Sequence, residues 1–187
     1  MRNVTVKVQG IQPLLIHRFT EQSQAKKSTR KMLIAEEEPR DVAKRAANIA
    51  PDGTFYISAF AIVGALGAAG SNHKMTGSRK TVRHLVPSAV RIANPTITID
   101  NGDGRPAKDF EVDSRPVTIP STKGRIMRHR PRFDNWSLTF DLQIDETLLP
   151  VEFVHTLLNE AGLAIGIGDF RPEKRGPFGT FRVVSFG

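Results

Sequence analysis

A run of basic side chains between positions 115 and 132 is the part of this sequence with the most definite chemical meaning. It holds no acidic residue and contains Arg115, Lys123, Arg125, Arg128, His129, Arg130 and Arg132. Guanidinium groups bind phosphate oxygens through paired hydrogen bonds and also stack on nucleobases. We therefore predict that this run contacts a polyanion. A solvated β-ribbon that only aids solubility is the alternative.

The net charge of the whole chain also favours a polyanionic ligand. Lys and Arg total 27 against 19 Asp and Glu, which gives a formal net charge of +8. A surplus of this size is typical of proteins that bind nucleic acid. If about five cations engage a single strand, log affinity falls with log salt concentration at a slope of roughly −3.5.

Two other basic segments are candidates for the same surface. One, at positions 26–31, offers Lys26, Lys27, Arg30 and Lys31, and the other, at positions 74–83, offers Arg79, Lys80 and Arg83. In an antiparallel α+β fold such loops can flank one face and form an electrostatic track. For either loop alone, a solvated surface is the simpler reading.

A glycine-rich loop at positions 162–179 is the second candidate binding element. Gly166 and Gly168 permit positive φ angles or a close backbone approach, and Arg171, Lys174 and Arg175 supply charge. The loop lacks the GK[ST] ending of a P-loop and precedes a strand. We predict phosphate or ribose contacts. A structural turn that closes the last helix onto the last strand is an equal alternative.

Aromatic side chains next to Arg or Pro are candidates for stacking on bases. They are Phe19, Phe133, Phe170 and Phe178. Stacking contributes about 1–3 kcal/mol per base. Phe170 and Phe178 are the stronger candidates because both lie in the glycine-rich loop.

Catalysis has weaker support in the sequence. His17 and His129 stand near basic residues and are candidates for general acid or base. A histidine beside arginines more often contacts phosphate. We expect no metal site and no cofactor.

Composition excludes several classes of protein. The 187 residues include no cysteine, which rules out disulfides and thiol catalysis. No apolar run approaches the ~20 residues that span a bilayer, and the N-terminus lacks a signal-peptide pattern. We expect one domain over residues 1–187, cytoplasmic and without membrane contact.

Alternating apolar residues predict the strands that must position these groups. Val4, Val6 and Val8 indicate a half-buried first strand, residues 136–144 a long one, and residues 181–186 a last one. The run at 115–132 precedes the strand at 136–144, which predicts a long hairpin with a basic arm at residues 113–135.

Helix signals lie between these strands. Pro39 begins a predicted helix that runs to about Ala50, and Ser58 caps an apolar helix at 59–69 that we expect to be buried all round. Its small residues would allow a sheet or strand backbone to approach closely, and packing must compensate for Gly64 and Gly67, which weaken a helix by up to ~1 kcal/mol each. Pro150 begins a last helix, and Gly162 ends it in a left-handed conformation.

The predicted order is strand, helical region, strand pair, helix and strand, which is the split βαβ arrangement. The fold class is therefore α+β, with a ferredoxin-like or RRM-like antiparallel sheet, helices on one face and a protruding basic β-hairpin.

Two of these segments resemble the RAMP superfamily of CRISPR-associated RNA-binding proteins. Loop 162–179 resembles its glycine-rich loop, and residues 55–70 are similar to the entry into the first helix of its effector-backbone subgroup. That entry is an Ile-Pro, small residues and Lys-Gly-x-Leu-Arg. This chain has Ser58, Val63 and Gly67 for the proline, lysine and arginine.

The resemblance implies a ferredoxin-like core, a protruding hairpin and copies that pack head to tail along a guide RNA. It fits a subunit of a CRISPR effector complex and also a stand-alone, for example phage-borne, relative. We therefore predict backbone binding of single-stranded nucleic acid, RNA preferred, by a homo-oligomer that also contacts other subunits. Alternatives are a metal-independent RAMP-type endoribonuclease, a single-stranded DNA-binding or annealing protein of a mobile element, and a module that binds an acidic protein.

Overall fold

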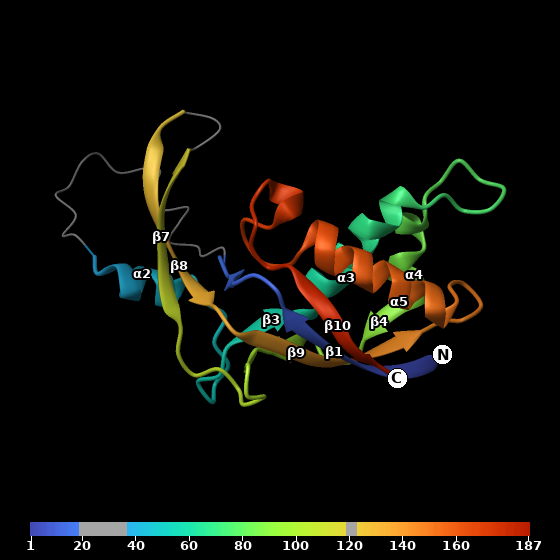
Figure 1. The fold of residues 1–187 in the computed structure, drawn as a ribbon, viewed down its shortest axis with the longest axis horizontal. Coiled ribbons are helices and arrows are strands. Elements are labelled where there is room, and N and C mark those ends of the chain that lie inside the picture. The colour runs from blue at the N-terminus through green and yellow to red at the C-terminus, as the bar shows by residue number, and fades with distance from the viewer. Residues whose placement is uncertain (19–36, 119–122) are drawn as a thin grey trace.

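The computed structural model describes residues 1–18, 37–118 and 123–187 (Figure 1). Its main elements in chain order are β1 (Arg2–Gly10), β2 (Leu14–Leu15), α2 (Pro39–Arg45), β3 (Tyr56–Ser58), α3 (Ala59–Ala69), α4 (Val86–Ala89), β4 (Val90–Ile92), β5 (Thr96–Thr98), β6 (Asp100–Asn101), β7 (Glu111–Thr118), β8 (Arg125–Phe133), β9 (Trp136–Ile144), α5 (Val151–Glu160) and β10 (Phe181–Phe186). Short 3₁₀ segments lie at Gly70–Asn72, Val82–His84 and Pro172–Lys174.

The central sheet is antiparallel, with the strand order β10-β1-β9-β4 and β6 also paired to β9. Along β1, the buried residues Val4, Val6 and Val8 alternate with exposed ones. Val6 lies opposite Phe140 of β9, so both strands present apolar side chains to the same core. The predicted strands at 136–144 and 181–186 have the bounds of β9 and β10, and both are confirmed.

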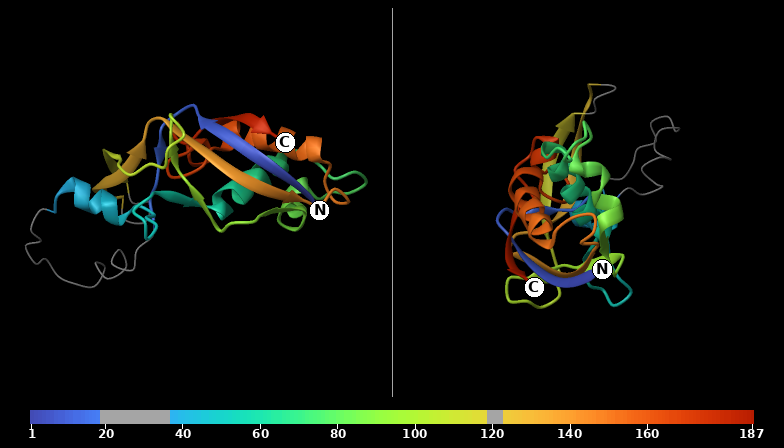
Figure 2. Two further views of the ribbon diagram at one scale, coloured as in Figure 1. Left: turned by 90° about the horizontal axis from the view of Figure 1, so that it is seen from below. Right: turned by 90° about the vertical axis from the view of Figure 1, so that its right-hand side faces the viewer.

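Helices α3 and α5 cover the same face of this sheet, as the views in Figures 1 and 2 agree. Ile62 and Leu66 of α3 and Val154 and Leu158 of α5 are fully buried in one core. α3 lies between β1 and β4 in the chain, and α5 lies between β9 and β10. This order, with this sheet, is the ferredoxin-like α+β fold that the sequence predicted.

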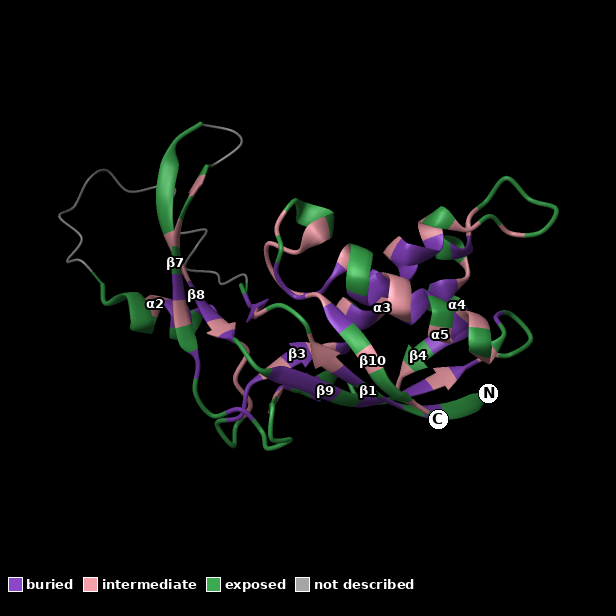
Figure 3. Ribbon diagram, in the orientation of Figure 1, coloured by how far each residue is buried: buried purple, intermediate pink, exposed green. Residues whose placement is uncertain are grey.

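A second, smaller sheet of order β2-β8-β7 stands out from the first at one end of the molecule (Figure 1). β7 and β8 form the predicted hairpin, in a register that runs from Glu111 opposite Arg132 to Thr118 opposite Arg125. Its base is buried and its outer half is exposed (Figure 3). Residues 119–122, between the strands, lie outside the described residues.

The helix at Pro39 is shorter than predicted and ends at Arg45, not near Ala50. The residues after it pair with the chain beyond the turn at 51–53: the Tyr56 N–H donates to the Asn48 carbonyl and the Ala50 N–H to the Thr54 carbonyl. These backbone groups cannot also form helix bonds, so tertiary pairing overrides the helix signal.

Helix α3 has the predicted bounds, and the Ser58 hydroxyl accepts from the Phe60 N–H as a cap. The prediction that it is buried all round is wrong, because Phe60 is 80% exposed and Gly64 is also exposed. The close approach of a strand that its small residues would allow does not occur at Gly64, where a Cβ would meet no described residue within 4 Å.

The end of α5 differs from the prediction that Gly162 adopts a left-handed conformation. The helix continues as a π-helical segment, Ala161–Ile165, and the residue with positive φ is Gly166, at 71°. Gly162 is needed for space, since a Cβ there would lie 2.3 Å from the Phe181 carbonyl oxygen. Within the described part of the chain, no helix is long and apolar enough to cross a membrane.

Candidate nucleic-acid interface

The outer half of the hairpin carries three cations that no carboxylate of the described chain neutralises. Lys123 and Arg125 are exposed and Arg128 is partly exposed, and in the described residues none of the three forms an ion pair. Two apolar neighbours, Ile126 and Met127, are 42% and 57% exposed. Cations beside apolar side chains suit a strand whose phosphates and bases are both accessible.

The cations at the hairpin base are paired within the protein. Arg115 Nε lies 2.6 Å from Asp113 Oδ1, and Arg132 Nε lies 2.8 Å from Asp134 Oδ1. These pairs reduce what Arg115 and Arg132 offer to an outside phosphate. The acid-free run did not predict these ion pairs, because Asp113 and Asp134 lie just outside it.

Arg130 points into the protein and not toward solvent. Its side chain is 2% exposed, and its Nε lies 3.4 Å from Asp169 Oδ2 in the glycine-rich loop. Desolvation lowers the pKa of its guanidinium, while Asp169 and Asp113 oppose that shift. In this conformation Arg130 is out of reach of a surface phosphate, and its position suits a structural link between hairpin and loop.

The two histidines predicted for catalysis lie close to these cations. The pKa of His17 is lowered, first by desolvation and next by Arg128, while Asp169 raises it. His129 Nδ1 lies 2.7 Å from Ser114 Oγ across the hairpin. A histidine that stays neutral beside an arginine can accept a proton near a bound phosphate. Among the described residues there is no cluster of three or more acids and histidines that could hold a metal ion.

The glycine-rich loop packs on the protein's own backbone. Gly166 and Gly168 have the predicted positive φ angles, 71° and 78°. A Cβ on Gly168 would lie 2.4 Å from the Leu15 carbonyl oxygen, which also accepts from the Asp169 N–H at 2.7 Å. These contacts support the structural-turn reading of both glycines, with the loop locked against β2.

Charge on this loop is partly neutralised. Arg171 donates to the Gly168 carbonyl at 2.9 Å and to Glu173, and Lys174 Nζ lies 3.9 Å from the same carboxylate. Arg175 is exposed, and no described carboxylate pairs with it. Arg175 is thus the cation of this loop best placed to meet a ligand.

Two of the three predicted stacking aromatics that the structure describes are buried. Phe178 is 6% exposed beneath the Arg115 guanidinium, which lies 4.6 Å from its ring centroid. Phe133 is 5% exposed and packs on Phe55. Phe170 keeps partial exposure, with its ring centroid 6.1 Å from that of Phe178. Phe19 lies outside the described residues.

Of the two further basic segments, the structure describes the one at positions 74–83. Lys26, Lys27, Arg30 and Lys31 lie outside the described residues. Arg79, Lys80 and Arg83 are exposed. Their loop lies at the opposite end of the long axis from the hairpin, but both rise on the side of the sheet that bears the helices (Figures 1 and 2).

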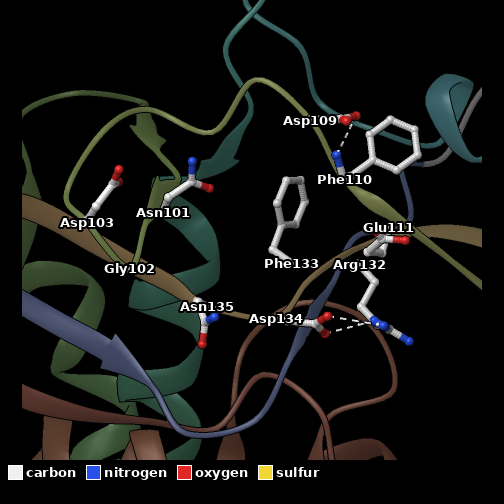
Figure 4. Close-up of a pocket in the computed structure, with 10 residues that line it drawn as sticks. All are labelled: Asn101, Gly102, Asp103, Asp109, Phe110, Glu111, Arg132, Phe133, Asp134 and Asn135. Carbon is white, nitrogen blue, oxygen red and sulfur yellow. Dashed lines mark hydrogen bonds and ion pairs between the residues drawn. The ribbon is translucent and has the colours of Figure 1, made fainter.

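Sequence reasoning missed a pocket at the foot of the hairpin, shown in Figure 4. It has a volume of about 490 Å³, and its lining includes the rings of Phe110 and Phe133 and the Arg132–Asp134 ion pair. Asp103, Asp109 and Glu111 also line it, and this negative charge disfavours a phosphate. The lining comes from three separate segments, so no local pattern could have revealed it.

Comparison with known proteins gives a likeness of fold. No family model matches the sequence, and no curated protein matches it. A chain of a structure described as "Type IV-B CRISPR Complex" is similar over 100% of this chain and 90% of its own length, with a TM-score of 0.51 and 12% identity. A chain of "Cryo-EM structure of the Type III-B Cmr-beta bound to cognate target RNA" is similar over 99% of this chain, with a TM-score of 0.54 and 12% identity. This chain spans 59% of the length of that second chain. The fold described above is thus similar to the fold of chains in CRISPR effector complexes.

Proposed function

We propose that this protein is a subunit of a CRISPR-effector-like complex and that it binds single-stranded nucleic acid, RNA in preference to DNA, by the sugar-phosphate backbone. The observation that carries the proposal is the hairpin, which stands clear of the sheet and ends in three cations that form no ion pair within the described residues. The likeness to a chain in a complex "bound to cognate target RNA" supports RNA as the ligand.

The proposed contacts come from the hairpin with the glycine-rich loop, and from the basic loop at the far end of the molecule. Lys123, Arg125 and Arg128 of the hairpin and Arg175 of the glycine-rich loop neutralise phosphates, and Phe170 stacks on a base. The exposed loop with Arg79 and Lys80 lies at the far end of the molecule, on the same side of the sheet, and offers two further cations. Phosphate contacts give affinity and position but little sequence preference.

Three of the other predicted residues hold these groups in place. Arg115 covers Phe178, Arg130 joins the hairpin to Asp169, and Arg171 fixes the turn at Gly168. A hairpin tied to the core at its base has little freedom to lose on binding, which favours affinity.

Purification without nuclease, followed by sequencing of whatever co-purifies, tests the ligand class. We expect RNA of varied sequence. Competition between RNA and DNA of one sequence should favour RNA, and DNA that competes equally would support the annealing-protein alternative. Protein free of nucleic acid that also fails to bind added RNA would contradict the proposal.

Association of copies along the strand is part of the proposal. The mass of the complex should then rise in steps as the oligonucleotide lengthens from about 10 to about 40 nucleotides, given sites of about 4–16 nucleotides. Light scattering after size-exclusion chromatography measures this mass. A single copy bound at every length would remove assembly from the proposal.

A nuclease activity is the second candidate, favoured by the lowered pKa of His17 beside Arg128. Incubation of labelled RNA with the wild type and with His17→Ala and His129→Ala separates the two functions. Intact RNA in all three supports a binding protein. Cleavage by the wild type that is lost in one variant identifies an endoribonuclease.

A further inference from the structure

A groove over the exposed face of α3 is left open by the described chain. Its volume is about 680 Å³. Phe60, Val63 and Gly64 of α3 line one side of it, and Val90, Ile92 and Pro95 line the other. Nearly all its lining side chains are apolar, which is typical of a surface that another molecule covers.

The residue at its edge supports this reading. Phe60 is 80% exposed, the highest exposure of any large hydrophobic side chain in the described residues. Aromatic side chains at this exposure are favoured where a partner buries them, because they contribute large apolar area with little loss of rotamer freedom.

Two glycines in the middle of α3 are not required by close packing against the described residues. Glycine weakens a helix interior relative to alanine. A Cβ at Gly64 would meet nothing within 4 Å, and one at Gly67 would meet only Arg83 Cγ, at 4.0 Å. The space that these glycines leave is the groove itself.

Charge limits what can occupy the groove. Arg83 and Arg91 are its charged lining residues, and no carboxylate of the described part of the chain lines it. The face of α3 offers no polar side chain that could bind a sugar or a phosphate. A second copy of this chain would bring a net charge of +8 toward two arginines. An apolar segment that carries carboxylates fits both features.

We propose that this groove docks a short acidic and apolar segment of a partner protein, whose apolar side chains lie on Phe60 and Val63 and whose carboxylates meet Arg83 and Arg91. This site is separate from the hairpin, and the inference does not depend on the nucleic acid that the hairpin binds.

The probe is a fluorescein-labelled helical peptide of about twelve residues with Leu on one face and Glu on the other, compared with a twin that has Lys for every Glu. Fluorescence anisotropy should show the Glu peptide binding the full-length wild type at least about tenfold more tightly than the Lys twin. Gly64→Leu adds an apolar side chain at the groove, from a position where a Cβ would meet no described residue within 4 Å. It should weaken binding of the Glu peptide about tenfold while melting no earlier than the wild type.

Two further variants separate docking from general effects. Arg91→Glu should reduce the preference for the Glu peptide over its Lys twin. Thr156→Leu adds the same apolar group on the exposed face of α5, outside the groove, and should change neither peptide's affinity.

The proposal is overturned by any of four results. Equal binding of both peptides indicates only apolar adhesion, and unchanged binding by both Gly64→Leu and Arg91→Glu places the peptide elsewhere. Displacement of the peptide by a uridine oligomer makes the occupant nucleic acid. A wild-type dimer that Gly64→Leu dissociates makes the occupant a second copy.

Discussion

Asp113 and Arg130 are charged side chains that the fold buries where the hairpin meets the glycine-rich loop, with exposed fractions of 4% and 2%. Asp113 Oδ2 and two guanidinium nitrogens of Arg130 have no hydrogen-bond partner within the described chain. Buried charges of this kind are tolerated only with opposite charges nearby, here Arg115 and Asp169. The cluster therefore makes the hairpin's direction depend on a few specific contacts.

Arg130→Met should lower the free energy of unfolding by about 3 kcal/mol, because it leaves two carboxylates near the interior without their shared cation. Urea denaturation followed by circular dichroism measures this loss. Arg125→Met, on the exposed outer half, is the matched control and should change stability by less than about 0.5 kcal/mol. Equal stability of the two variants would contradict a structural role for Arg130.

His17 should titrate below 6.5, the pKa of an unperturbed histidine, because desolvation and Arg128 both disfavour its charged form. In NMR titrations of the ring protons, Arg128→Ala should raise this pKa and Asp169→Asn should lower it further. Shifts in the opposite directions would show that His17 does not sense these two charges.

The same shift predicts how stability depends on pH. As the pH is lowered below 6.5, the unfolded state binds a proton on His17 before the folded state does. The free energy of unfolding therefore decreases as the pH is lowered from about 6.5 to the folded pKa. At higher pH the ring is neutral in both states and contributes no slope. Unfolding of His17→Gln should therefore depend less on pH just below 6.5 than unfolding of the wild type.

At the scale of elements, the sequence predicted those strands and helices whose signals lie in consecutive residues. Alternation along Trp136–Ile144, the Ser58 cap and the acid-free run gave β9, α3 and the hairpin with correct or nearly correct positions. Each of these patterns is contained in a few consecutive residues, so it can be recognised without knowledge of the tertiary structure.

Sequence could not predict which of the cations are free. Arg130 is buried because Asp169, far along the chain, comes to lie beside it. Gly162 looked like a helix stop because the contact that requires glycine there, with the Phe181 carbonyl, is tertiary. The exposed face of α3 was not predicted for the same reason. An apolar helix with one exposed face has the same composition as one that is buried on all sides.

Gly162→Ala and Gly64→Ala test the two kinds of glycine in opposite directions. The first pushes a methyl group against the Phe181 carbonyl and should cost about 2 kcal/mol of stability. The second adds helix propensity in open space and should gain up to about 1 kcal/mol. Urea denaturation of both variants measures the difference, and equal effects would contradict the assigned packing.

At the scale of the molecule, cations lie on both sides of the sheet, and the proposed RNA-binding surface lies on one of them. The hairpin, the glycine-rich loop and the loop with Arg79 rise on the side that bears the helices (Figures 1 and 2). On the other side, Lys7 and Arg182 are exposed and alternate with buried neighbours along β1 and β10, and Arg91 is exposed on the edge strand β4. Total charge alone would give both groups equal weight.

The salt dependence of RNA affinity separates these groups most directly. Lys123, Arg125 and Arg128 changed together to Ala should weaken binding to every RNA sequence and flatten the slope of log affinity against log salt by about 2, since each phosphate contact on a single strand contributes about 0.7. Lys7, Arg91 and Arg182 changed together to Ala remove the same charge and should leave the slope unchanged. A slope that the hairpin variant retains, or that the two triple variants flatten equally, would contradict the hairpin as the binding surface.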